Sequence, residues 1–136
     1  MRERFSPELA MVVRIVCPVR IGATRVDSVR ALVRTVHELN RQYLRHNPTT
    51  PLLYKSGVVY GREPEAIREE FATIPQVLRQ GWGDCDDLAP WRSAELAELH
   101  GIDALPDVLN PRPGLYHIIV RHPDGHTEDP SRILGM

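Results

Sequence analysis

Residues 81–101 of this chain read GWGDCDDLAPWRSAELAELHG and define its clearest structural element. The two glycines at the start of this stretch are typical of a turn. A helix is then expected to begin at Asp84 or Cys85 and to reach His100, because Gly101 stands where a C-terminal cap belongs. Cys85 is therefore expected at or next to the N-terminus of a helix.

The last third of the chain predicts antiparallel β structure. Residues 115–121 (LYHIIVR) form a predicted strand, and Pro-Asp-Gly at 123–125 is typical of a tight turn. Residues 126–129 then return as the partner strand. A further, short strand is expected at Val108-Leu109.

The register of this hairpin decides which side chains share a face. If His122 pairs with His126, then His117 and Asp129 become diagonal neighbours on one face of the hairpin. A loop one residue longer or shorter would turn Asp129 to the other face. In the favourable register, the carboxylate of Asp129 is within reach of the His117 imidazole.

The N-terminal part of the chain predicts one strand and one long helix. Residues 11–17 (MVVRIVC) are apolar and rich in β-branched side chains, which is typical of a strand. Apolar residues at helical spacing predict a helix that begins at Asp27 or Ser28 and runs to about Arg45. The two prolines in residues 47–51 are expected to stop it.

The middle of the chain has weaker signals. Residues 52–60 are expected to be extended, with a bend at their glycine. Residues 64–71 are expected to form a short helix that ends before Pro75, and residues 76–80 then lead into the turn that precedes Cys85.

Length and composition fit one globular domain. The chain has 136 residues, of which 42% are hydrophobic, and 17 basic against 18 acidic residues leave a net charge of −1. This charge balance argues against binding to nucleic acid or to an anionic membrane. We expect a single α+β domain over residues 1–136, with a strand and a long helix in 1–50 and the core in 52–136.

The chain has two cysteines, Cys17 and Cys85, which are too few for a disulfide framework. Reduced thiols in a soluble, cytoplasmic protein are the default expectation. Arg14 and Pro18 interrupt the apolar run near the N-terminus, so no signal peptide is expected. No stretch approaches the ~18 apolar residues of a membrane span.

Cys85, His117 and Asp129 are the candidate catalytic residues. The N–H groups and the macrodipole at the start of a helix favour negative charge, which promotes the thiolate form of a cysteine. A carboxylate that accepts a hydrogen bond from a histidine fixes its tautomer and stabilises the imidazolium. A cysteine at a helix start and a carboxylate-oriented histidine are the parts of an activated nucleophile.

These residues lie in three motifs that resemble the transglutaminase-like superfamily of papain-related Cys-His-Asp proteins. The motifs are Gly83-Asp84-Cys85-Asp86-Asp87-Leu88-Ala89, His117-Ile118-Ile119-Val120, and Gly125 followed by Asp129-Pro130-Ser131. The resemblance covers residues 52–136 and is strongest at 81–89 and 115–135. It implies a small transglutaminase-like or papain-like domain in which the cysteine begins a helix packed on an antiparallel sheet. The chain is also similar to short transglutaminase-like proteins of tailed phages.

The resemblance implies acyl transfer at an amide bond of a peptide or protein. Cys85 would attack the carbonyl and form a thioester, with His117 acting first as base and then as acid. Water as the acceptor would make the protein a peptidase or amidase, and an amine would make it a transglutaminase. The alternative is a catalytically silent scaffold with a binding or assembly role, associated with a virion if the protein is phage-encoded.

The residues next to Cys85 raise two further questions. Asp84, Asp86 and Asp87 would oppose thiolate formation through their negative charge, although carboxylates also stabilise a helix start. The backbone N–H of Cys85 is a generic oxyanion donor, and Gln80 or Trp82 could add a side-chain donor or line a substrate cleft.

No metal and no cofactor are expected. The spacing of His117, His122, His126 and Asp129 does not match a helical or knuckle set of metal ligands. The acidic run at 84–87 lacks the later glycine and the distal glutamate of a calcium loop.

Overall fold

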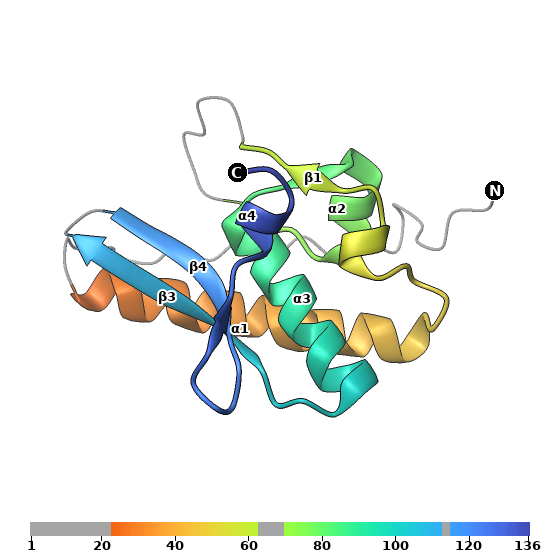
Figure 1. The fold of residues 1–136 in the computed structure, drawn as a ribbon, viewed down its shortest axis with the longest axis horizontal. Helices are drawn as coiled ribbons and strands as arrows, with labels where there is room; N and C mark the ends of the chain where they lie inside the picture. The colour runs from red at the N-terminus through yellow and green to blue at the C-terminus, as the bar shows by residue number, and fades with distance from the viewer. Residues whose placement is uncertain (1–22, 63–69, 113–114) are drawn as a thin grey trace.

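The structure, a computed structural model, describes residues 23–62, 70–112 and 115–136 (Figure 1). The strand predicted at 11–17 and nearly all of the helix predicted at 64–71 lie outside the described residues. In chain order the elements are α1 (Ala23–His46), the 3-10 helix η2 (Leu53–Lys55), β1 (Val59–Tyr60), α2 (Ile74–Gln80), β2 (Trp82–Gly83), α3 (Cys85–His100), β3 (Leu105–Arg112), β4 (Leu115–Arg121), β5 (Thr127–Glu128) and α4 (Pro130–Ile133). The α+β class is therefore confirmed for the described residues.

Helix α3 has the ends that the sequence predicts. It begins at Cys85 with Asp84 as its N-cap, and it ends at Gly101, whose φ of 65° is left-handed. Pro90 lies inside the helix and is buried. Most of the side chains of α3 are buried around its whole circumference, which is typical of a central helix rather than a surface one.

Helix α1 begins earlier than the sequence predicts. Its first residue is Ala23, so neither Asp27 nor Ser28 is the N-cap. The Asp27 carboxylate instead accepts a hydrogen bond from Arg30, one turn further along the helix, at 3.1 Å. The C-terminal end at His46 agrees with the predicted stop.

The antiparallel sheet has the order β3-β4-β5, with β4 in the centre. β4 has its predicted bounds, whereas β3 covers residues 105–112 and is much longer than the predicted Val108-Leu109. β3 contains Pro106 and Pro111, and prolines are tolerated there because β3 is the edge strand of the sheet formed by the described residues. In Figure 1 the sheet and α3 lie in front of the long helix α1.

The structure has a second, two-stranded sheet where the sequence predicts only an extended segment and a simple turn. Residues 82–83 form β2, which pairs in parallel with β1. The preceding residues form helix α2, with Pro75 in its first turn and Gly81, at a φ of 81°, as its C-cap. This small sheet brings the segment around Tyr60 alongside the residues that lead into Cys85.

Two clusters of buried side chains hold these elements together. The first core cluster joins α1, α3 and the sheet through Val29, Val33, Ala89, Leu96, Ala104, Val108, Ile118 and Val120. The second core cluster joins α1, η2, α2 and α3 through Leu44, Leu53, Val58, Ile74, Val77, Leu88, Trp91 and Ala94. Helix α3 contributes to both clusters, so its position depends on nearly every other described element.

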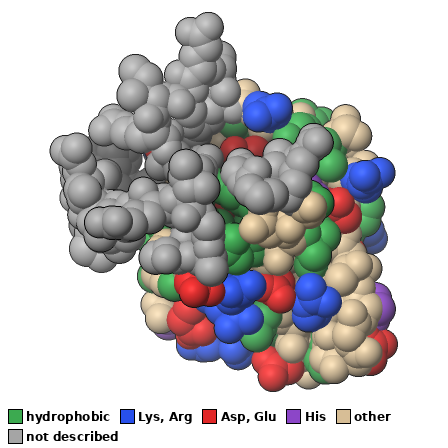
Figure 2. Space-filling model, turned by 90° about the vertical axis from the view of Figure 1, so that its left-hand side faces the viewer, with side chains coloured by type: hydrophobic (Ala, Val, Ile, Leu, Met, Phe, Trp, Pro, Cys, Tyr) green, Lys and Arg blue, Asp and Glu red, His purple; other side chains and the backbone are tan. Residues whose placement is uncertain are grey.

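The described surface shows no single dominant charge in the view of Figure 2, where acidic and basic side chains lie next to one another. Such pairing occurs where Asp107 on β3 accepts hydrogen bonds from Arg30 and Arg121, each at 3.0 Å. None of the described helices is long and apolar enough to cross a lipid bilayer.

Candidate functional site

Cys85 is the first residue of α3 and follows β2 directly. Its thiol is half-buried and packs against the first core cluster. Because α3 has 16 residues and begins at this position, the unpaired N–H groups and the positive end of the helix dipole favour an anion here. The structure thus gives Cys85 the helix position that the sequence predicts.

The structure joins the other two candidate residues directly. His117 Nε2 lies 2.8 Å from Asp129 Oδ2, and both side chains are about three-quarters buried. A carboxylate only accepts, so this bond assigns the proton to Nε2 and leaves Nδ1 of the imidazole unprotonated in the neutral ring. The elements that carry Cys85 and His117, α3 and β4, pack against each other.

The hairpin register on which this contact depends is the favourable one. The backbone N–H of His122 donates to the carbonyl of His126 at 2.9 Å. Further along, Arg121 pairs with Thr127 and Val120 pairs with Glu128. The predicted pairing is therefore confirmed, although β5 covers only residues 127–128 of the predicted 126–129.

Two residues, His117 and Arg132, hold the carboxylate of Asp129. Its Oδ2 accepts from His117, and its Oδ1 accepts from the backbone N–H of Arg132 at 3.4 Å, which makes Asp129 the N-cap of α4. The Arg132 guanidinium also lies 3.5 Å from Oδ2. Helix α4, which the sequence analysis did not predict, therefore holds the carboxylate in place for the imidazole.

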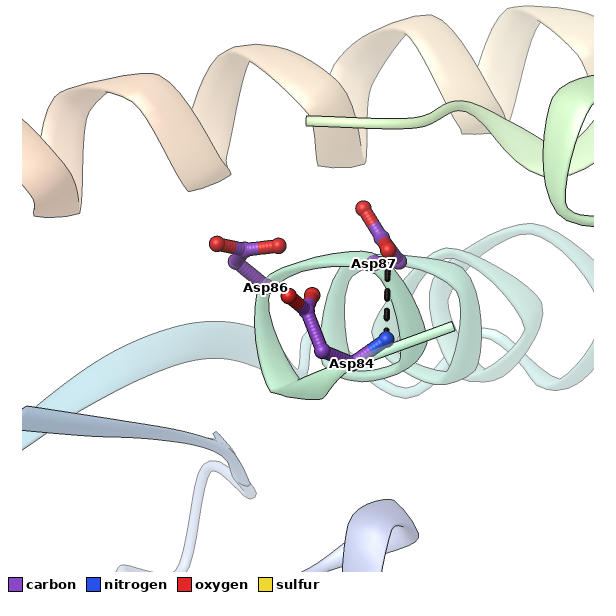
Figure 3. A group of neighbouring side chains, drawn as sticks. All are labelled: Asp84, Asp86 and Asp87. Carbon is purple, nitrogen blue, oxygen red and sulfur yellow. Dashed lines mark hydrogen bonds between the residues drawn. The ribbon is translucent and has the colours of Figure 1, made fainter. Parts of the chain in front are cut away.

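Three carboxyl groups surround the start of α3 (Figure 3). Oxygen atoms of Asp84, Asp86 and Asp87 lie within 4.8 Å of one another, and the side chains of Asp86 and Asp87 are buried. Asp87 accepts backbone hydrogen bonds from Ala72 at 2.7 Å and from Asp84 at 3.2 Å. Asp87 therefore has a structural role, since it ties the segment before α2 to the first turn of α3.

Burial changes the charge of this cluster. It raises the pKa of Asp86 strongly, and the hydrogen bond to Asp84 and the charges of Asp87 and Asp84 raise it further. Burial and the charge of Asp84 also raise the pKa of Asp87 to about 8, despite opposing backbone hydrogen bonds. Near neutral pH the cluster therefore keeps protons, and its charge is smaller than the three formal charges expected from the sequence.

Among the described residues, these three aspartates are the group that could hold a metal ion. Asp84 Oδ1 and Asp86 Oδ1 are buried without a hydrogen-bond partner. Both oxygens of Asp87 are occupied by backbone N–H groups, so the cluster offers few free oxygens compared with the roughly six to eight that calcium takes. The cluster alone therefore does not define a metal centre.

The histidines near the hairpin turn each have a carboxylate partner. His122 Nε2 lies 3.0 Å from Glu128 Oε1, and His126 Nδ1 lies 2.5 Å from Asp124 Oδ1. The two rings stack with their centroids 3.9 Å apart. Both histidines therefore have carboxylate partners other than Asp129.

We expect Asp86→Asn to stabilise the protein at alkaline pH. A carboxyl group whose pKa is raised on folding favours the folded state at low pH, and this contribution is lost as pH rises toward the raised pKa. Removing the titrating group should therefore raise the free energy of unfolding at pH 8 by about 1–3 kcal/mol and flatten its decline between pH 5 and pH 8. Guanidinium chloride unfolding in EDTA measures this difference.

The exposed Asp103→Asn is the control for this prediction and should leave the pH dependence unchanged. If Asp86→Asn were no more stable than the wild type at pH 8, Asp86 would be a well-stabilised anion in the wild type.

The candidate oxyanion residues have different surroundings. The side-chain amide of Gln80 donates to the backbone carbonyl of Trp82 at 2.7 Å, so one of its N–H groups is already bonded to a residue of β2. Trp82 is half-buried and packs on Gly61, where an added Cβ would lie 3.1 Å from the Trp82 Cβ. These contacts give both residues a role in shaping the segment before Cys85.

Tyr60 is a neighbour of Cys85 that the sequence analysis did not assign to the site. It pairs with Gly83 in the small parallel sheet. Burial raises the pKa of Tyr60, and the negative charge of a Cys85 thiolate would raise it further. The hydroxyl of Tyr60 therefore stays protonated near neutral pH. The sequence holds no signal for this contact because it depends on pairing between strands that lie far apart in the chain.

Searches against known protein families, curated proteins and solved structures find no match to this chain.

Proposed function

We propose that the protein is a cysteine-dependent acyl-transfer enzyme that acts on an amide bond of a peptide or protein. The observation that carries this proposal is the 2.8 Å contact between His117 and Asp129, on a strand that packs against the helix headed by Cys85. The resemblance of the three sequence motifs to transglutaminase-like proteins is a second argument, independent of the tertiary structure.

In the proposed reaction, Cys85 transfers its proton to His117 and its sulfur forms a bond to the amide carbonyl carbon. The backbone N–H of Cys85, at the start of α3, is the generic donor for the oxyanion. His117 then gives its proton to the departing amine as the carbon–nitrogen bond breaks, which leaves a thioester. Water or a second amine then attacks the thioester and loses a proton to His117. As the carbon–sulfur bond breaks, His117 returns a proton to the sulfur, which frees the acyl product and the thiol. Asp129 holds the imidazole in one tautomer throughout.

The reactivity of Cys85 tests this proposal without a known substrate. In a Cys17→Ser background, iodoacetamide labelling followed by intact mass should be fast near pH 6, because only a thiolate reacts. His117→Ala should slow labelling at that pH by about tenfold or more, because the variant lacks the base that activates the thiol. His126→Ala, in the same hairpin but exposed and bonded to Asp124, is the matched control and should leave the rate unchanged.

Labelling that rises only near the ordinary thiol pKa of ~8.5 and that ignores the His117 substitution would exclude the enzymatic proposal. The scaffold alternative would then be favoured, because the acidic residues around Cys85 suit a structural helix start.

A further inference from the structure

Glu128, the residue before Asp129, belongs to a network of hydrogen bonds that includes none of the three proposed catalytic residues. Glu128 Oε2 accepts from Arg92 Nε at 2.6 Å and from the Tyr54 hydroxyl at 2.5 Å. Glu128 Oε1 lies 3.0 Å from His122 Nε2. We call these four residues, Tyr54, Arg92, His122 and Glu128, the Glu128 network. It connects η2, α3, β5 and the turn residue that follows β4.

The network holds Glu128 as an anion. Burial acts to raise the pKa of Glu128, but hydrogen bonds from Tyr54, Arg92 and His122 together lower it below its usual value. Arg92 is fixed in turn, because its guanidinium lies 4.9 Å from the centre of the Tyr54 ring and 3.4 Å from Glu95 Oε1. The ion pair is thus built into a surrounding structure rather than formed by two flexible surface side chains.

Strand β5 needs such an anchor because its backbone pairing is minimal. Only Thr127 and Glu128 pair with β4, and the chain turns into α4 immediately after Asp129. Two paired residues restrain a strand end weakly. The side chain of Glu128 is therefore one link between this strand end and the rest of the molecule, beside the Asp129–His117 contact and the packing of α4 against α3.

The other end of the link is on the helix that begins with Cys85. Arg92 lies seven residues after Cys85 on α3, which is about two helical turns, so both side chains are on a similar side of the helix. The contact between Arg92 and Glu128 therefore directly links the helix that begins with the thiol to the residue before Asp129.

We propose that the Arg92–Glu128 ion pair is a positioning device that holds Asp129 against His117 in register with α3. Neither residue is a catalytic residue in this proposal, and both act through Asp129. The inference rests on the proposed function, because that function requires Asp129 to be aligned with α3.

Glu128→Gln tests the proposal, and Glu98→Gln is its matched control. Glu98 is also an acidic residue bonded to arginines, Arg41 and Arg45, and its side chain is 16% exposed against 18% for Glu128. It joins α3 to α1, away from the hairpin. Thermal unfolding of both variants measures the cost of losing a comparable ion pair.

The first readout is Cys85 labelling at pH 6 in the Cys17→Ser background. We expect Glu128→Gln to slow labelling by about tenfold, as small misplacements of a catalytic group do, and Glu98→Gln to leave it unchanged. In an Asp129→Asn background, Glu128→Gln should not slow labelling further, because the Asp129 carboxylate that Glu128 positions is already absent. Arg92→Met should reproduce the defect, and Arg92→Lys should restore part of the rate.

The second readout is independent of enzymatic function. Nitrogen-15 NMR of the His117 ring reports whether the proton stays on Nε2, as the bond to Asp129 requires. We expect a mixture of tautomers in Glu128→Gln and a single tautomer in Glu98→Gln. An unchanged tautomer and an unchanged labelling rate in Glu128→Gln would overturn the inference.

The two readouts separate this inference from the proposed function. If His117→Ala slows labelling but Glu128→Gln changes neither readout, the function stands and the positioning role is wrong. If His117→Ala has no effect on labelling, the function is wrong, and the tautomer of His117 in Glu128→Gln alone decides whether the ion pair positions Asp129.

Discussion

Trp91→Ala is expected to lower the free energy of unfolding by about 3–5 kcal/mol, the range for removing a fully buried aromatic side chain. Trp91 has no exposed surface and is the largest fully buried side chain among the described residues. It lies in the second core cluster, where α1, η2, α2 and α3 meet. The cavity left by alanine could close only if several of these elements moved together.

Guanidinium chloride unfolding followed by circular dichroism measures this loss. Trp91→Phe is the control, because it keeps an aromatic ring in the core while it removes part of the side-chain volume and the 2.9 Å hydrogen bond from Nε1 to Glu95. We expect the phenylalanine variant to lose less than half as much stability as the alanine variant. A loss below about 1.5 kcal/mol for alanine, typical of volume-conserving changes, would show that the core at Trp91 repacks.

Glu95→Ala is expected to cost about 3–5 kcal/mol, because one partner of a buried charged network is removed. The Glu95 side chain is fully buried, and its Oε2 accepts from the backbone N–H of Leu53 at 2.6 Å and from Trp91. Alanine would leave both donors buried without an acceptor and would remove a partner of Arg92. Since Leu53 begins η2, we expect this segment to loosen first.

Glu95→Gln separates the hydrogen bonds from the charge. Burial raises the pKa of Glu95 despite the hydrogen bonds from Leu53, Arg92 and Trp91. Glutamine keeps one oxygen acceptor without the cost of a buried charge, so we expect its loss of stability to be well below that of alanine. Hydrogen exchange at the Leu53 amide is the local readout. Equal protection of that amide in wild type and Glu95→Ala would contradict the role assigned to Glu95.

The part of the candidate site that could be predicted is the part built from local structure. His117 and Asp129 are only 12 residues apart, and the turn between them carries a recognisable Pro-Asp-Gly sequence. Once the turn sets the register, the alternation of a strand determines which side chains meet. The position of Cys85 at a helix start likewise follows from residues adjacent to it.

The electrostatic environment of the site could not be predicted in the same way. The burial of Asp86 and Asp87 depends on contacts made by segments distant in the chain, such as the backbone N–H of Ala72. The spacing of three aspartates in the sequence indicates only their charge. Their high pKa values result from desolvation, which is a property of the packed molecule.

The sequence by itself therefore determined the ends of α3 and the position of β4, because caps and alternation act over a few residues. It left open registers of the hairpin that differ by one residue, and the structure has the one in which His122 pairs with His126. Only the tertiary structure decided the length of β3, the pairing of β1 with β2, and the network that joins Arg92 to Glu128. These features depend on contacts between distant segments. Such contacts form because burial and pairing stabilise them in the folded molecule, and they leave no local pattern in the chain.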